Sequence, residues 1–340
     1  MAQGTLPPPL LTEQPSALTG NLTTCEIHDG FLALLLPVMY ALIFCTGLLG
    51  NGLALWVFQY RSQRKSSTAV YLWNVAVSDL LLVLCLPLRV AYQNQPGPLL
   101  LCNTVGALFY LNMYVSITFL SLISLDRYLK ILRPHQQYRM HSIPWSRAVS
   151  ILVWLFSLIC MTPFFFEARK PEPCSEKCFH FRSKGLLAAV INITAVVVFF
   201  VLLVLFICSY TEISKKLCRL PPRRTEQPGR SSSATAVTKT LVVLVIFIVS
   251  FVPYHTVRLP YVLAQLDIIS SVAWKQALHT ANEVALCISA LNSCMDPVIY
   301  FFLSNSFRKA MLCTLQGKFK IIFLKESWSN TSRNRSITDL

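Results

Sequence analysis

Seven stretches of the chain stay apolar for about twenty residues or more, and no other feature restricts the fold so strongly. They run roughly over 31–59, 68–93, 99–132, 146–166, 184–214, 237–265 and 275–303. A helix needs about 20 mostly apolar residues to cross a bilayer, so each stretch is long enough to span one. Several contain proline, which membrane helices tolerate because neighbouring groups satisfy the freed carbonyls.

The composition supports the same interpretation. Of the 340 residues, 54% are hydrophobic and 13% are charged, whereas a soluble domain carries about 25% charged residues. The excess apolar side chains must contact lipid. The sequence therefore predicts an all-α fold, a seven-transmembrane helical bundle in a membrane.

The basic residues predict the orientation of this bundle. Of the 30 Lys and Arg, 22 lie in 60–67, 126–147, 211–239 and 304–340, and the first thirty residues contain none. Because Lys and Arg accumulate in cytoplasmic loops, we expect the N-terminus outside and the C-terminus inside. The net charge of +15 then indicates attraction to anionic membrane lipids and not to nucleic acid.

Four of the twelve cysteines fall on predicted outer segments, namely Cys25, Cys102, Cys174 and Cys178. Disulfides persist on that oxidising side of the membrane. Four cysteines allow three connectivities. A Cys102–Cys178 bridge would pin the second outer loop over the bundle and leave Cys25 with Cys174, while the alternative is one bridge and two free thiols.

Several short motifs lie at particular places on the seven stretches. Asp126, Arg127 and Tyr128 end the third stretch, where charges are costly and usually functional. The other landmarks, in chain order, are Gly50–Asn51, Asn74–Asp79, Cys102, Trp154, Tyr210, Pro253 and Asp296–Tyr300. Together, over roughly 30–317, they resemble the rhodopsin-like (class A) G-protein-coupled receptors.

Further residues resemble the purinergic-like cluster of that family. SFVPYH and DPVIY replace more usual motifs, and NLTTC, ISLDRYLKI, KCFHF and TANEVAL look closest to the lysophosphatidylserine-type receptor. ADP-type receptors carry a Lys at the position of Asn282 and a cysteine in the third outer loop, which 265–274 lacks. The resemblance therefore disfavours a nucleotide ligand and favours a bridge between Cys25 and Cys174.

The resemblance implies three regions and a location in the plasma membrane as a multi-pass protein. Residues 1–30 form an extracellular tail with a glycosylation sequon at Asn21, and we interpret the sequons at Asn192, Asn330 and Asn334 as chance matches. Residues 31–303 form the seven-transmembrane receptor domain. Residues 304–340 form a cytoplasmic tail that begins with a short amphipathic helix.

The resemblance also implies a switch that activates a heterotrimeric G protein, of the inhibitory class. Asp126 holds Arg127 in the silent receptor, and Arg127 turns toward Tyr210 and Tyr300 when the helices shift. Tyr128 completes the motif. The alternative is a charge pair that only anchors the helix at the membrane surface.

A ligand site is predicted among the outer halves of the helices, which carry six polar residues on apolar spans: Arg89, Tyr110, Tyr254, His255, Arg258 and Asn282. Arginine binds phosphate and carboxylate bidentately, which favours an anionic ligand. Alternatively, the two arginines reach the headgroups or pair with Glu283. For an acyl chain we expect Phe109, Met113, Val190, Val197 and Phe200, so an anionic lysophospholipid is the predicted ligand and a nucleotide the alternative.

A second polar set suits a sodium ion, which the resemblance places in the inactive state. Its residues are Asp79, Ser116, Asn292 and Asp296, with Asn51 and Ser293 nearby. Oxygen ligands of this kind suit a hard cation. The alternatives are a protonated carboxylate or a purely structural polar network. No other metal or cofactor is expected.

The C-terminal segment carries candidate modification sites. Cys313 is a palmitoylation candidate, or a plain cysteine. The Ser and Thr residues beyond 326 suit phosphorylation by receptor kinases and recognition by arrestin, or form a solvated tail.

Other classes of protein fit the sequence less well. No catalytic residues are predicted, because the six His are scattered and no paired catalytic groups appear. A transporter would show inverted repeats, and a light sensor needs a Lys within 281–303, where there is none. A non-signalling scavenger remains as the alternative.

Overall fold

The computed structural model describes residues 27, 30–61, 66–133, 141–166, 176–219 and 233–315. Seven stretches of helix in these ranges are long and apolar enough to cross a bilayer, which confirms the predicted fold class. The helices are α1 Leu32–Trp56, α2 Ser67–Ala91, α3 Leu99–Leu132, α4 Ile143–Phe166, α5 Leu186–Arg219, α6 Ser233–Gln265, α7 Val272–Ala290, α8 Asn292–Leu303 and α9 Asn305–Leu315; a π-helix, η1 Val57–Arg61, extends α1.

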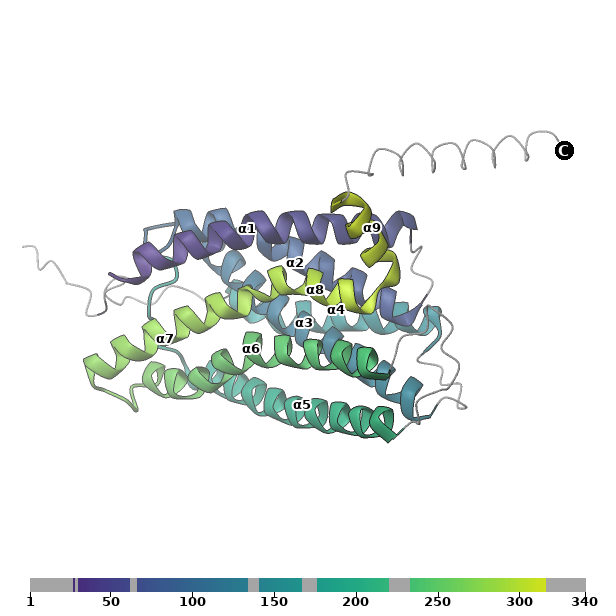
Figure 1. The fold of residues 1–340 in the computed structure, drawn as a ribbon. Coiled ribbons are helices and arrows are strands. Elements are labelled where there is room, and N and C mark those ends of the chain that lie inside the picture. The colour runs from purple at the N-terminus through teal and green to yellow at the C-terminus, as the bar shows by residue number, and fades with distance from the viewer. Residues whose placement is uncertain are drawn as a thin grey trace, which may run out of the picture.

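The seven spans pack lengthwise into one bundle (Figure 1), with α2 between α1 and α3 and with α5 beside α6. Large side chains such as Phe119, Phe247 and Phe251 fill its centre and are fully buried. The outer faces are apolar as well: Ile151 is 60% exposed and Val204 58%. Such surfaces are stable only against lipid, as the composition requires.

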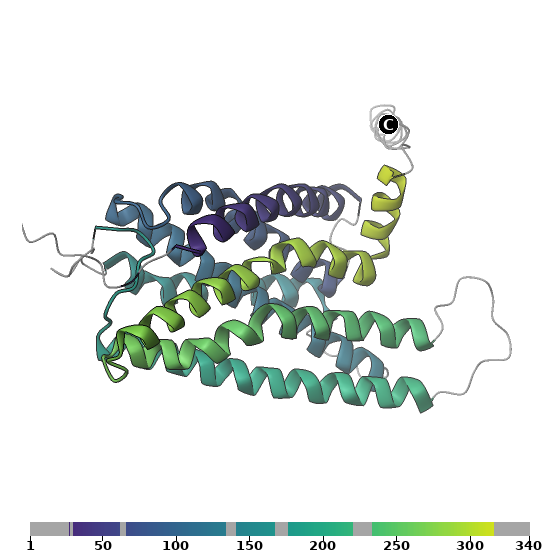
Figure 2. The same ribbon diagram turned by 60° about the vertical axis from the view of Figure 1, so that its left-hand side comes forward.

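The two ends of the bundle differ in chemistry. At one end a disulfide joins Cys102, near the start of α3, to Cys178; we call it the disulfide end. At the other end α3 carries Asp126, Arg127 and Tyr128; we call it the DRY end. α5 and α6 run side by side to the DRY end (Figure 2), and α9 turns across the bundle there.

The seventh apolar stretch consists of two helices instead of one, since α7 ends at Ala290 and α8 begins at Asn292. Proline has no N–H, so Pro297 leaves the carbonyl of Ser293 without its helical partner. Asn51 of α1 supplies a donor, its Nδ2 lying 2.7 Å from that carbonyl oxygen. Gly50 permits this approach, because a Cβ there would lie 2.5 Å from Pro297 Cγ.

The other boundaries agree with the sequence within a few residues, with two differences. α5 continues past the predicted 214 to Arg219, and α6 begins at Ser233, before the predicted 237. The apolar sequence pattern ends where a span leaves the lipid. The helix itself continues beyond that point as long as its backbone hydrogen bonds are satisfied. The predicted amphipathic helix corresponds to α9, which buries Phe307 and Ala310.

Candidate functional site

The segment around Cys178 covers the disulfide end. The Cys178 N–H donates to the Gln95 carbonyl at 2.9 Å, and the Asn94 N–H donates to the Cys178 carbonyl at 3.2 Å. Gly97 lies against the bridge, since a Cβ there would be 2.8 Å from Cys178 Sγ. The predicted Cys102–Cys178 bridge is confirmed, while Cys25, Cys174 and the sequon at Asn21 lie outside the described residues.

Beneath this cover lies a cavity of about 130 Å³ whose lining includes four of the six predicted ligand residues: Arg89, Tyr110, Arg258 and Asn282. Arg182 and Lys184 line it too, with apolar area from Phe109, Phe164, Phe179 and Leu286. Tyr254 and His255 lie outside the lining. The His255 ring stacks on Phe199 with 3.7 Å between centroids, and its Nδ1 lies 2.8 Å from the Phe251 carbonyl.

Arg89 of α2 is neutralised within the protein. Its guanidinium forms an ion pair with Glu283 of α7, and both side chains are buried. The Phe179 ring lies 3.8 Å from the guanidinium carbon and the Phe109 ring 5.4 Å. Arg89 therefore follows the alternative in which an arginine pairs with Glu283 instead of with a ligand.

Arg258 of α6 is buried without an acidic partner among the residues that the structure describes. Asn192 Oδ1 accepts from its Nε at 2.9 Å and from its Nη2 at 2.8 Å, and Asn282 Oδ1 accepts from Nη1 at 3.1 Å. The rings of Tyr110, Tyr254 and Tyr261 surround it at 5.4–5.6 Å. These groups orient the positive charge but leave it uncompensated.

Sequence reasoning missed Asn192, which it treated as a chance sequon. A lone amide on an otherwise apolar span was the available signal, because such a group needs a partner in the membrane. The predicted acyl-chain residues need a correction as well. Phe109 and Met113 are buried, but Val190 is 51% exposed, Val197 56% and Phe200 37%, so these three face the lipid side of α5.

The predicted sodium residues meet in the middle of the bundle and are buried. Asp79 Oδ1 accepts from Ser293 Oγ and from Asn112 Nδ2, both at 2.9 Å. Asp296 Oδ2 accepts from Asn292 Nδ2 at 2.6 Å. Three buried oxygens have no hydrogen-bond partner in the described part of the chain: Ser116 Oγ, Asn292 Oδ1 and Asp296 Oδ1. Unpartnered acceptors beside two carboxylates fit a cation.

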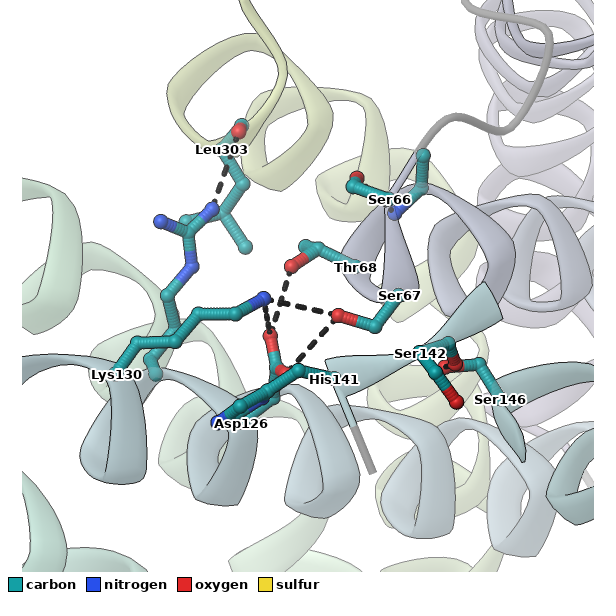
Figure 3. A network of polar contacts seen from close by, with 11 residues as sticks. Ser66, Ser67, Thr68, Asp126, Lys130, His141, Ser142, Ser146 and Leu303 are labelled. Atoms are coloured by element: carbon teal, nitrogen blue, oxygen red, sulfur yellow. Dashed lines mark hydrogen bonds and ion pairs between the residues drawn. The ribbon is translucent and has the colours of Figure 1, made fainter. Parts of the chain in front are cut away.

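At the DRY end, Asp126 binds groups other than Arg127 (Figure 3). Its carboxylate accepts from Ser67 and Thr68 of α2, each at 3.0 Å. It pairs with Lys130 at 2.7 Å and with His141 Nδ1 at 2.8 Å. The sequence predicted an ion pair between Asp126 and Arg127. Among the described residues, Asp126 forms its ion pairs with Lys130 and His141 and not with Arg127.

Arg127 Nη2 instead approaches the Leu303 carbonyl at 3.4 Å, and its buried Nε has no hydrogen-bond partner in the described ranges. Tyr210 OH lies 2.8 Å from Ser124 Oγ. Tyr300 OH donates to Asn51 Oδ1 and to Asp79 Oδ2, each at 3.2 Å. Both tyrosines therefore have partners other than Arg127 in this structure.

A seven-helix bundle with a capped polar cavity at one end and an Asp-Arg-Tyr cluster at the other defines a class of protein. The model of the 7 transmembrane receptor (rhodopsin family) matches residues 50–300. The chain belongs to this family of G-protein-coupled receptors, whose members are receptors and not enzymes, and it is a multi-pass protein of the plasma membrane.

Individual relatives support the purinergic-like cluster. The chain is 40% identical over 314 residues to "Probable G-protein coupled receptor 34" of Pan troglodytes, covering 90% of this chain and 82% of that receptor. It is 33% identical over 296 residues to a purinoceptor (type 14) of Bos taurus, covering 84% and 87%. It is 31% identical over 302 residues to "Platelet-activating factor receptor" of Cavia porcellus, with the same two coverages.

Proposed function

We propose that this receptor binds an anionic, lysophospholipid-like ligand at the disulfide end, which faces the outside of the cell. The observation that carries the proposal is the buried charge of Arg258. An isolated charge in a low-dielectric interior is costly, and amides and aromatic rings offset that cost only in part. A phosphate or carboxylate in the cavity would accept two charge-assisted hydrogen bonds from this guanidinium.

Arg89 contributes less to anion recognition than sequence reasoning expected. Glu283 already occupies its guanidinium, so the pair presents no net charge to a ligand. Arg182 and Lys184 in the lining add positive charge. The field in the cavity therefore remains positive and is centred on Arg258.

The lining favours an amphiphile over a nucleotide. Phe109, Phe164, Phe179 and Leu286 share it with the cations, and each buried CH₂ of an acyl chain contributes about 0.8 kcal/mol. A cavity of about 130 Å³ is smaller than the roughly 300–1,000 Å³ of drug-sized sites. It suits a headgroup, and a bound chain requires the helices to part. Similarity to the purinoceptor of Bos taurus keeps a nucleotide as the second candidate.

The receptor family acts through heterotrimeric G proteins, and we propose the inhibitory class for this chain. Ligand binding would shift α6 through Arg258 and release Arg127 from Leu303, so that Arg127 can meet Tyr210 and Tyr300. Receptor kinases and arrestin would act on the C-terminal residues, and Cys313 of α9 would be palmitoylated. We further propose that sodium binds Asp79, Ser116, Asn292 and Asp296 and stabilises the silent bundle.

The test is a G-protein activation assay with lysophospholipid and nucleotide panels on the wild type and Arg258→Ala. Lys275→Ala is the matched control, because Lys275 lies near the same end but pairs with the exposed Asp267 at 2.5 Å. We expect a lipid response that Arg258→Ala loses and Lys275→Ala keeps at equal surface expression. A response to nucleotides alone would overturn the lipid assignment. Binding without nucleotide exchange on any G protein would indicate a scavenger.

A further inference from the structure

A second cavity, of about 270 Å³, lies at the DRY end, remote from the ligand cavity. We call it the DRY-end cavity. Its polar lining comes from the start of α2, the end of α3 and the junction of α8 with α9, namely Ser66, Thr68, Arg127, Lys130, Ser304 and Ser306. Figure 3 shows Ser66, Thr68, Lys130 and Leu303 around one space.

The charges around the DRY-end cavity are positive. Arg127 and Lys130 line it, and no acidic residue belongs to the part of the lining that the described residues provide. Asp126 lies close by, but its carboxylate already accepts from Ser67, Thr68, Lys130 and His141. Lys130 forms an ion pair with Asp126 at 2.7 Å, so the two charges offset each other and the net positive charge at the cavity comes from Arg127.

Arg127 lines the cavity and is incompletely satisfied by the rest of the protein. Its Nε is buried and has no hydrogen-bond partner in the described part of the chain. Its bond to the Leu303 carbonyl, at 3.4 Å, is longer than the usual 2.7–3.2 Å. A guanidinium carries five N–H donors, and those on its terminal nitrogens can bind an oxyanion through two parallel hydrogen bonds.

Two helix N-termini face the same space. α2 begins at Ser67, with Ser66 as its cap, and α9 begins at Asn305, directly after Ser304. The positive ends of helix dipoles favour anions. They add to the net positive charge of Arg127, and the hydroxyl groups of Ser66, Ser304 and Ser306 in the lining provide further donors.

We propose that the DRY-end cavity binds a phosphomonoester, and that the bound phosphate restrains Arg127 against α2 and α8. The cavity falls just below the roughly 300–1,000 Å³ of whole-ligand sites, which suits a phosphorylated headgroup better than a complete lipid. The phosphate has two conceivable sources, a soluble phosphorylated metabolite or a phosphoinositide headgroup. Because Arg127 belongs to the G-protein switch, an occupied cavity lowers coupling.

The proposal is tested by direct binding, without agonist or G protein, so its failure is distinct from failure of the proposed ligand. The full chain is purified into phosphatidylcholine nanodiscs and its thermal unfolding is followed against inositol 1,4,5-trisphosphate, at ionic strength matched with chloride. A parallel arm uses nanodiscs that contain phosphatidylinositol 4,5-bisphosphate. A ligand that binds the folded state raises the unfolding temperature with its concentration, which yields a dissociation constant.

The matched variants are Ser306→Glu and Ser306→Gln, which differ in charge but not in size. We expect Ser306→Glu to raise the dissociation constant at least about tenfold, because it places a like charge against the phosphate, and Ser306→Gln to change it by less than about threefold. Stabilisation by the soluble probe and not by the lipid indicates a metabolite, and stabilisation by the lipid, with or without the soluble probe, indicates a headgroup. Equal affinity of the two variants, or no stabilisation of the wild type by either probe, overturns the proposal.

Discussion

Replacing Asn192 by Asp tests whether the free charge of Arg258 recognises the ligand. Asn192 Oδ1 already accepts two hydrogen bonds from this guanidinium, at 2.8 and 2.9 Å. Aspartate has nearly the same shape, so the substitution converts the contact into an ion pair and alters little else. Arg258 would then resemble Arg89, which Glu283 neutralises.

The expected loss of affinity has two physical sources. A hydrogen bond to a charged group contributes about 1.5–3 kcal/mol, and the ligand would have to share the guanidinium. The new carboxylate would also repel a phosphate roughly 6 Å away by about 3 kcal/mol at an effective dielectric constant of about 20. Because these two contributions overlap, we expect a total loss of about 3 kcal/mol of binding free energy. This corresponds to roughly a 100-fold lower affinity for the ligand.

The assay is nucleotide exchange on the G protein as a function of lysophospholipid concentration. Asn192→Ala is the control, because it removes the acceptor of two hydrogen bonds without adding a charge, and we expect a change of no more than about tenfold. A potency of Asn192→Asp equal to that of the wild type, at equal surface expression, would refute the role of Arg258 as the anion-binding charge.

Three further predictions concern other contacts. Glu283→Gln leaves Arg89 buried without its charged partner, so the free energy of unfolding, measured by thermal unfolding, should fall by about 3–5 kcal/mol. A fall of less than about 1 kcal/mol would contradict a buried ion pair. Gly50→Ala places a Cβ against Pro297, and we expect about 1–3 kcal/mol of destabilisation, seen as lower expression and melting temperature, whereas an unchanged melting temperature would show that the helices can part. Asp79→Asn should abolish the dependence of basal nucleotide exchange on sodium at constant ionic strength; a persistent sodium effect would place the ion elsewhere.

The sequence predicted the spans well because the bilayer imposes their length and polarity. It did not predict the break between α7 and α8. A window of hydropathy treats 275–303 as one stretch, whereas Pro297 frees a carbonyl that Asn51 of a distant helix then satisfies. The contact that satisfies this carbonyl joins residues far apart in the chain, and no local pattern contains it.

The same reason limited prediction of the site. Arg89 and Arg258 were both recognisable as polar residues on apolar spans, and local sequence gave them equal standing. Similarly, the adjacency of Asp126 and Arg127 suggested a pair, but neighbouring residues on a helix point in different directions and do not face each other. Ser67, Thr68, Lys130 and His141 surround Asp126 instead.

The sequence by itself determined the seven-span architecture, the receptor family and the presence of buried polar groups. These follow from composition and local spacing, which lipid thickness and the cost of membrane charges constrain directly. Only the tertiary structure decided which charge is neutralised and which stays available. Helix rotation and register place Glu283 beside Arg89 and place Asn192 beside Arg258, and these depend on packing across the whole bundle.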